Sequence, residues 1–153
     1  MEATELRIRN YVWEDYSGEM IVSMINDYDC AISLRKNTTL PFGLYGIKDI
    51  NPIPLTEQWL KDFGAIIEKA NLDNDINYGL RTTMSLNVGD FTLIYETQTP
   101  FKDPKFHQGH TKMILEGSGG YEYTGELDLT DIVKYVHQLQ NLYFALTGKE
   151  LSK

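Results

Sequence analysis

The sequence predicts an α+β protein that combines antiparallel sheets with one long C-terminal helix. Short segments of alternating apolar and polar residues, separated by turn-forming residues, run through most of the chain. Only residues 131–147 carry a sustained helical repeat of apolar side chains. The hydrophobic content of 42% over 153 residues is sufficient for a core, so we do not expect a disordered chain.

The first segment, residues 1–50, is predicted to form a small SH3-like β subdomain. Apolar and polar residues alternate in several short runs, and turn-forming residues stand between them, as at Tyr16–Gly18 and Asn26–Asp29. Short strands joined by tight turns favour a small barrel or a curled antiparallel sheet. So few strands bury little surface, and we therefore expect this subdomain to lean on the rest of the chain.

The second segment, residues 51–64, is predicted to be a proline-rich connector followed by a short helix. Pro52 and Pro54 fix their own φ angles and push the preceding residues out of the helical region. Thr56 is a favourable N-cap, and Gly64 can end the helix in a left-handed conformation.

The third segment, residues 65–153, is predicted to form an antiparallel sheet packed against the C-terminal helix, together one compact unit. One hairpin is expected across Asn87–Asp90 and a second across Gly117–Gly120. Thr130 is expected to cap a helix from Asp131 to Thr147, which Gly148 ends. At about 25 Å such a helix can lie across the whole second sheet.

The charge of the chain is acidic and concentrated at its two ends. The formal net charge is −8, which argues against a direct nucleic-acid binder or an anionic-membrane binder, because these need basic side chains. Residues 1–34 hold seven acids and two bases, and residues 113–153 hold six acids and three bases. Such a surface can steer a basic partner; the alternative, that acidity only keeps the protein soluble, stays open. The predicted acidic surface consists of Glu14, Asp15, Glu19, Glu122 and Glu126.

The remaining compositional features predict a cytoplasmic protein. Cys30 is the only cysteine, so neither an intramolecular disulfide nor a cysteine-based zinc site can form. The N-terminus shows no signal-peptide pattern, and no apolar run approaches the length of a membrane span. We therefore expect no membrane partner.

Three segments of the chain resemble a known group of proteins. Leu6–Val12, Asp49–Leu60 and Tyr135–Leu151 are similar to segments of small uncharacterised proteins encoded by phages and prophages of Bacteroidetes bacteria. In that group glycine is expected where this chain has Arg9. The resemblance implies a phage or mobile-element origin, and hence the host cytoplasm as location. It implies no activity, cofactor or catalytic residue.

No motif predicts catalysis, a metal or a cofactor. His107 and His110 stand three residues apart in a loop with no nearby acid to complete a ligand set. Gly117–Gly120 is followed by the strand-like segment Tyr121–Thr124, which favours a hairpin turn over a phosphate-binding loop. No Ser-His-Asp, Cys-His or paired-carboxylate arrangement stands out, so we predict that the protein is not an enzyme.

The C-terminal helix carries the candidate partner-binding surface. Between Tyr135 and Gly148 there is no Asp, Glu, Lys or Arg, whereas a solvated helix face would carry several. Aromatic residues among uncharged polar ones are typical of interface cores. The alternative, that this side packs under the N-terminal barrel in the same molecule, stays open. The predicted partner-binding residues are Val133, His137, Gln140, Asn141 and Phe144.

Two functions remain after these exclusions. The first is a non-enzymatic protein-binding accessory factor of phage or prophage origin, with a host or phage protein as its partner. The partner can be basic, and inhibition of a host defence protein or a nucleic-acid-handling protein is the specific hypothesis; self-association as a homodimer is also open. The alternative is a small-ligand-binding protein or enzyme that uses a groove between the two sheets, lined by Tyr78, Tyr95, Tyr121 and Tyr123.

Overall fold

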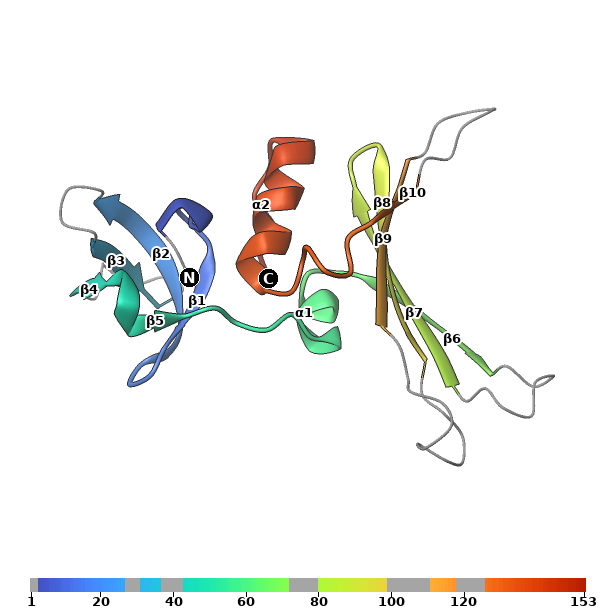
Figure 1. Cartoon of the computed structure of the whole chain (residues 1–153), viewed down its shortest axis with the longest axis horizontal. Helices are drawn as coiled ribbons and strands as arrows, with labels where there is room; N and C mark the ends of the chain where they lie inside the picture. The colour runs from blue at the N-terminus through green and yellow to red at the C-terminus, as the bar shows by residue number, and fades with distance from the viewer. Residues whose placement is uncertain (1–2, 27–30, 37–42, 72–79, 99–110, 118–125) are drawn as a thin grey trace. The chain divides into compact units, whose positions relative to one another are not determined.

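A computed structural model of the chain contains two antiparallel sheets of five strands each and a C-terminal helix (Figure 1). The structure describes residues 3–26, 31–36, 43–71, 80–98, 111–117 and 126–153. The predicted α+β class is therefore confirmed. By its contacts the chain divides into two compact units, which are described in turn. Unit 1 comprises Met1–Leu55 with Lys134–Leu151, and unit 2 comprises Thr56–Val133 with Ser152–Lys153.

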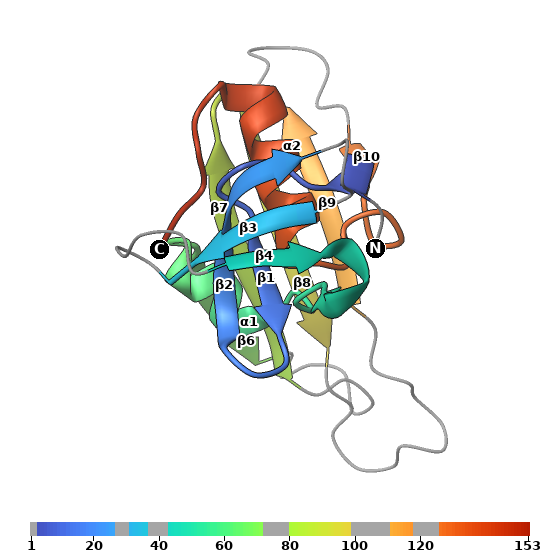
Figure 2. The same cartoon turned by 90° about the vertical axis from the view of Figure 1, so that its left-hand side faces the viewer.

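The sheet of unit 1 has the strand order β4-β3-β2-β1-β5, with every neighbouring pair antiparallel. A register shift between Val22 and Met24 marks an irregularity in β2, and Figure 2 shows β3 and β4 running across the direction of β1. Such irregularities bend a strand and allow a sheet to curl. The strands are β1 (Tyr11–Glu14), β2 (Gly18–Asn26), β3 (Ala31–Arg35), β4 (Gly43–Gly46) and β5 (Ile50–Asn51), with 3₁₀ turns η1 (Ala3–Glu5) and η2 (Ile47–Asp49).

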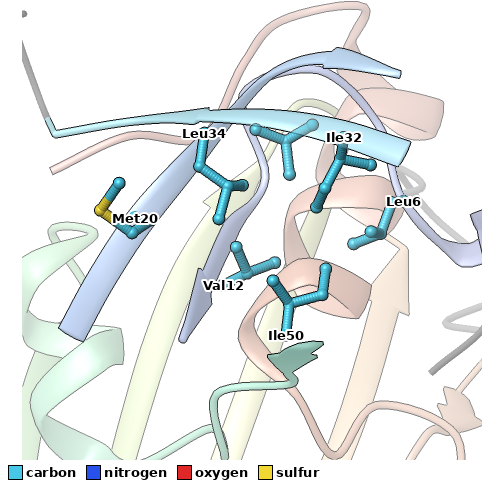
Figure 3. Close-up of a cluster of buried hydrophobic side chains, with 7 residues drawn as sticks. Leu6, Val12, Met20, Ile32, Leu34 and Ile50 are labelled. Atoms are coloured by element: carbon cyan, nitrogen blue, oxygen red, sulfur yellow. The ribbon is translucent and has the colours of Figure 1, made fainter. Parts of the chain in front are cut away.

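This sheet surrounds a core of its own (Figure 3). Side chains alternate between the two faces of a strand, and residues at every second position of β1 and β2, such as Val12, Met20 and Val22, point into the cluster. Each is fully buried, and burial of an apolar side chain of this size stabilises the fold by roughly 1.5–3 kcal/mol. The buried members of the cluster are Leu6, Val12, Met20, Val22, Ile32, Leu34 and Ile50.

The chain enters β1 through a tight turn that ends just before Tyr11. Arg9 has a φ of 77°, the left-handed region that glycine adopts most easily. Asn10 closes the turn, because its Oδ1 accepts a hydrogen bond from Arg7 N at 2.7 Å. Arg9 N donates to Val22 O at 2.7 Å, so the turn is anchored on β2.

The C-terminal helix α2 (Val136–Thr147) groups with unit 1 by its contacts, whereas the sequence analysis grouped it with the second sheet. The contacts thus divide the chain differently from the predicted segments 1–50, 51–64 and 65–153. The helix also begins five residues later than predicted. Its end is as expected, because Gly148 has a φ of 67° and donates to Phe144 O at 2.8 Å.

The late start of α2 has a non-local cause. Tyr135 has extended backbone angles and forms an antiparallel bridge with Pro54. Leu55 N donates to Lys134 O, and Val136 N donates to Ile53 O, both at 2.9 Å. The connector therefore holds Tyr135, the residue before Val136, in an extended conformation that a helix cannot share.

Thr130 does not cap the helix, because it is used elsewhere. Its hydroxyl donates to Asp128 Oδ1 at 2.6 Å and accepts from Met113 N at 3.0 Å. The cap of α2 comes instead from Gln138, whose Oε1 accepts from Lys134 N at 2.8 Å and from Tyr135 N at 3.1 Å.

The sheet of unit 2 has the order β10-β9-β8-β7-β6, again antiparallel throughout. Its β7–β8 hairpin turns at Gly89-Asp90, within the predicted turn, and Gly89 has the positive φ of 69° that such turns use. The second predicted hairpin pairs β9 with β10; of its predicted turn at Gly117–Gly120, Gly117 ends β9 and the remaining residues lie outside the described part of the chain. The elements are α1 (Glu57–Asp62), β6 (Ile66–Asn71), β7 (Leu80–Val88), β8 (Phe91–Gln98), β9 (Thr111–Gly117) and β10 (Glu126–Asp128).

The core of unit 2 joins one face of this sheet to the short helix α1. Thr56 caps α1 as predicted, accepting from Trp59 N at 3.4 Å, and Gly64 follows the helix with a φ of 86°. Lys153 Nζ lies 3.7 Å from the centre of the Trp59 ring and 3.9 Å from Asp62 Oδ2, so the chain end is held on α1. The buried apolar residues include Trp59, Leu60, Phe63, Met84, Leu86, Leu93, Met113 and Leu115.

Candidate functional site

Unit 1 contains a concave site of about 440 Å³, which we call the acidic hollow. The β1–β2 turn forms one wall, and the segment from β4 through η2 to β5 forms the other. The two walls meet because β5 pairs with β1, with Trp13 opposite Asn51 and Glu14 opposite Ile50. The lining residues are Glu14, Asp15, Tyr16, Tyr45, Lys48, Asp49 and Asn51.

Glu14 shapes the first wall from within and is only 4% exposed. Its carboxylate oxygens accept hydrogen bonds from Ser17 N at 2.7 Å and from Tyr16 N at 3.3 Å. A hydrogen bond with the Ser17 side chain is the largest of the effects that hold the pKa of Glu14 below its ordinary value. This carboxylate therefore fixes the turn and is not part of an exposed acidic surface, which corrects its predicted place there.

The turn that Glu14 holds presents Asp15 and Tyr16 to solvent. The Tyr16 side chain is 98% exposed, so its ring covers none of the core. Asp15 Oδ1 accepts a hydrogen bond from Asn51 Nδ2 at 3.2 Å, which joins the two walls of the acidic hollow. An exposed aromatic residue on a constrained turn is typical of binding surfaces rather than of core packing.

The second wall adds a carboxylate whose position is set by a glycine. A Cβ atom at Gly46 would lie 2.9 Å from Asp49 Oδ2, so a side chain at position 46 would displace this carboxylate. Glu14, Asp15 and Asp49 stand against Lys48, so the lining has a formal charge of −2. Carboxylates beside aromatic faces are the groups that bind guanidinium and ammonium cations.

Trp13 adds a second exposed aromatic ring next to this site. Its side chain is 46% exposed, and it stands in register with Asn51 on one side and Glu19 on the other. The ring lies beside Gly18, where a Cβ atom would be in ordinary van der Waals contact with it at 3.7 Å. The neighbourhood of the acidic hollow thus offers Trp13 and Tyr16, residue types that dominate binding energy at protein interfaces.

The predicted acidic surface is divided by the structure. Asp15 and Glu19 are exposed in unit 1, and Asp15 lines the acidic hollow. Glu126 is exposed on β10 in unit 2. Glu122 lies outside the described residues. The sequence analysis missed Tyr45 and Asp49, which stand more than 25 positions beyond Asp15 and reach the site through the pairing of β5 with β1.

The predicted partner-binding residues of α2 pack inside unit 1. Gln140 is 0% exposed; its Oε1 accepts from Tyr11 N at 2.8 Å, and its Nε2 donates to Leu151 O at 2.9 Å and Arg9 O at 3.2 Å. The Gln140 amide thus satisfies the N–H of Tyr11 and the C=O of Arg9, two backbone groups that a neighbouring strand would otherwise bond. Gln140 is therefore an internal structural residue.

The other members of that set are also engaged. Asn141 Nδ2 donates to Glu5 O at 2.8 Å, and Asn141 Oδ1 accepts from Asn10 Nδ2 at 3.1 Å. The Arg7 guanidinium lies 3.5 Å from the centre of the Phe144 ring. His137 is buried, and Val133 is buried in unit 2, where its N–H donates to Leu129 O. This face of α2 thus packs against the N-terminal segment of the same molecule. The sequence analysis had left this arrangement open as the alternative to a partner-binding surface.

Several other sequence candidates gain no support as sites. His107 and His110 lie outside the described residues, as do Cys30, Tyr78, Tyr121 and Tyr123. Tyr95 lies on β8, in register with Met84 and Met113. Among the residues that the structure describes, no group of three or more His, Cys, Asp or Glu side chains could hold a metal ion. Within the same part of the chain, no helix is long and apolar enough to cross a membrane.

Comparisons with known proteins give no relative: no family model, no curated protein and no solved structure matches this chain.

Proposed function

We propose that the protein is a non-enzymatic binding factor that takes up a basic, arginine-bearing segment of a partner protein in the acidic hollow. The observation that carries this proposal is the fully exposed ring of Tyr16 beside the carboxylate of Asp15, on a turn that Glu14 holds in place. A turn fixed in this way is ready for a partner, so little ordering free energy opposes binding.

The lining of the acidic hollow suits a guanidinium better than an ammonium. A guanidinium can stack on an aromatic face and donate paired hydrogen bonds to a carboxylate at the same time. Tyr16 and Tyr45 supply the rings, and Asp15 and Asp49 supply the carboxylates. A cation over an exposed ring contributes about 0.5–1 kcal/mol. The net charge of −8 additionally favours encounter with a basic partner.

The scaffold of unit 1 supports the further proposal of an SH3-like barrel. The strand order β4-β3-β2-β1-β5, the 3₁₀ turn η2 between the two edge strands, and a separate core all agree with such a barrel. Three segments of the chain also resemble phage and prophage proteins. We therefore propose that the protein is an accessory factor that binds a host or phage protein and thereby inhibits it.

The test compares capture by three forms of the full chain from host lysate: the unmodified protein, the double variant Asp15→Asn/Tyr16→Ala, and the control Glu126→Gln. Glu126 is exposed in unit 2, so its substitution removes an acid without touching the acidic hollow. We expect a partner that the double variant binds at least tenfold more weakly, that the control retains, and that high salt releases. Equal capture by the double variant and the unmodified protein would refute the proposal, as would a complete lack of stoichiometric partners.

A further inference from the structure

The helix α2 makes a contact with the N-terminal segment, and the same face of the helix carries His137, a buried side chain without a hydrogen-bond partner in the described part of the chain. We call this contact the α2 clasp: Glu5, Arg7 and Asn10 on one side, and His137, Gln140, Asn141 and Phe144 on the other. Hydrogen bonds join Asn141 to Glu5 O and to Asn10, and Arg7 lies on Phe144. At about 100° per residue the four helix residues share one face of α2.

His137 lies in the first turn of α2 and is only 1% exposed. Neither Nδ1 nor Nε2 has a hydrogen-bond partner within the described part of the chain. The imidazole instead stacks on the Tyr135 ring, with centroids 5.8 Å apart and planes 9° from parallel. A neutral imidazole tolerates such surroundings, whereas an imidazolium needs water or an acceptor for each N–H.

The charges around His137 do not supply that acceptor. Burial is the largest effect and lowers its pKa; the charge of Glu5 raises the pKa, and the amino terminus of the chain lowers it. Arg7 and Glu150 pair with each other at 3.3 Å, and α2 itself has no charged residue between Val136 and Thr147. The positive end of the α2 dipole disfavours a cation further. Burial in the closed clasp therefore disfavours the charged form of His137.

We propose that the α2 clasp is an acid-sensitive latch, in which uptake of a proton by His137 releases the N-terminal segment from α2. The open form exposes the imidazole to water and binds the proton more readily than the closed form does. Because the pKa in the closed form lies below the ordinary value of 6.5, the contribution of His137 to closure is fully present above that value and weakens as the pH falls below it.

The size of the effect follows from proton linkage. If only the open form binds the proton, with the ordinary pKa of about 6.5, the opening constant rises by a factor of one plus ten to the power of 6.5 minus pH. That factor is about 11 at pH 5.5 and about 1.1 at pH 7.5. Acidification over this range should therefore open the clasp more often, with a tenfold increase as the upper limit.

Amide hydrogen exchange of the full chain at pH 5.5 and 7.5, corrected for the intrinsic exchange rate, measures this opening. The Tyr11 amide is a direct reporter, because its N–H donates to Gln140 Oε1. We expect opening at pH 5.5 to exceed opening at pH 7.5, by up to tenfold, in the unmodified protein and a ratio near one in His137→Phe and His137→Gln. The double variant His107→Gln/His110→Gln, which changes the other two histidines of the chain, should keep the ratio of the unmodified protein.

Two results would overturn the latch. One is a pH dependence of Tyr11 exchange that survives in both His137 variants. The other is an NMR titration of the His137 ring in the unmodified protein that gives a midpoint at or above 6.5. This second measurement needs no substitution, so it decides the question even if the variants do not fold.

Discussion

The most informative substitution in unit 1 is Gln140→Met, which keeps the size of the side chain and removes its hydrogen bonds. The Gln140 amide makes three contacts, with Tyr11 N–H, Arg9 C=O and Leu151 C=O. Methionine fills a similar volume without polar atoms that can replace the amide. The substitution therefore tests whether this buried amide holds the unit together.

The expected loss of stability follows from the backbone groups that would be left without partners. The bonds to Tyr11 and Leu151 are buried, and an unsatisfied buried backbone group costs about 1–3 kcal/mol. The bond to Arg9 is only partly buried, so water can replace part of it. Better burial of the methionine offsets about 1 kcal/mol. We therefore expect a loss of about 3 kcal/mol in the free energy of unfolding, a factor of roughly 150 in the unfolding equilibrium.

Urea unfolding is the suitable assay, because each unit carries one of the two tryptophans of the chain. Trp13 lies in unit 1 and Trp59 in unit 2, so a Trp59→Phe background leaves fluorescence from unit 1 alone. Gln58→Met, read from Trp59 in a Trp13→Phe background, is the control: it makes the same substitution on an exposed helical residue of α1 in unit 2 and should cost less than about 0.5 kcal/mol. A loss below about 1 kcal/mol for Gln140→Met would refute the structural role of this amide.

Three further predictions concern single residues. Because Arg9 has a φ of 77°, Arg9→Gly should be more stable than Arg9→Ala by about 1 kcal/mol in urea unfolding. At a residue with negative φ the alanine variant is normally the more stable one. A glycine variant less stable than the alanine variant would therefore contradict the left-handed conformation of Arg9. The pKa of Glu14 is lowered in the fold, so its contribution to stability is present above its ordinary value of 4.5 and is lost as the pH falls through the lowered value. Glu14→Gln should therefore destabilise at pH 7, and this loss should shrink steadily in thermal melts as the pH falls below 4.5; an equal effect at every pH would count against the carboxylate's role. Gly148→Ala should lower the free energy of unfolding by about 1 kcal/mol. The φ of 67° is the only cause, since no atom lies within 4 Å of the added Cβ. An unchanged midpoint of urea unfolding would exclude the left-handed cap.

Elements whose signals are local were predictable from the sequence. Gly64 and Gly148 follow their helices in left-handed conformations, and the β7–β8 turn falls at Gly89, because each depends on residues within a few positions. The start of α2 was not predictable in this way. Residues 131–135 have a pattern compatible with a helix, but Tyr135 is held extended by Pro54, which is 81 positions away in the sequence.

The candidate site was accessible only in part for the same reason. Charge alone identified Asp15 and Glu14, yet the inward bonds of Glu14 depend on the geometry of one turn. Tyr45 and Asp49 join the acidic hollow through the pairing of β5 with β1, which the sequence does not specify. The sequence showed that one face of α2 is uncharged. It did not show whether that face binds a partner or packs inside the molecule, because this depends on contacts with residues far away in the sequence.

An NMR titration of the labelled full chain with a peptide of alternating arginine and glycine tests the binding role of the acidic hollow most directly. The account predicts saturable shifts confined to the amides of residues 14–17 and 45–51, lost in Asp15→Asn/Tyr16→Ala and weakened by salt. Absent shifts, or shifts that the double variant leaves unchanged, would contradict it.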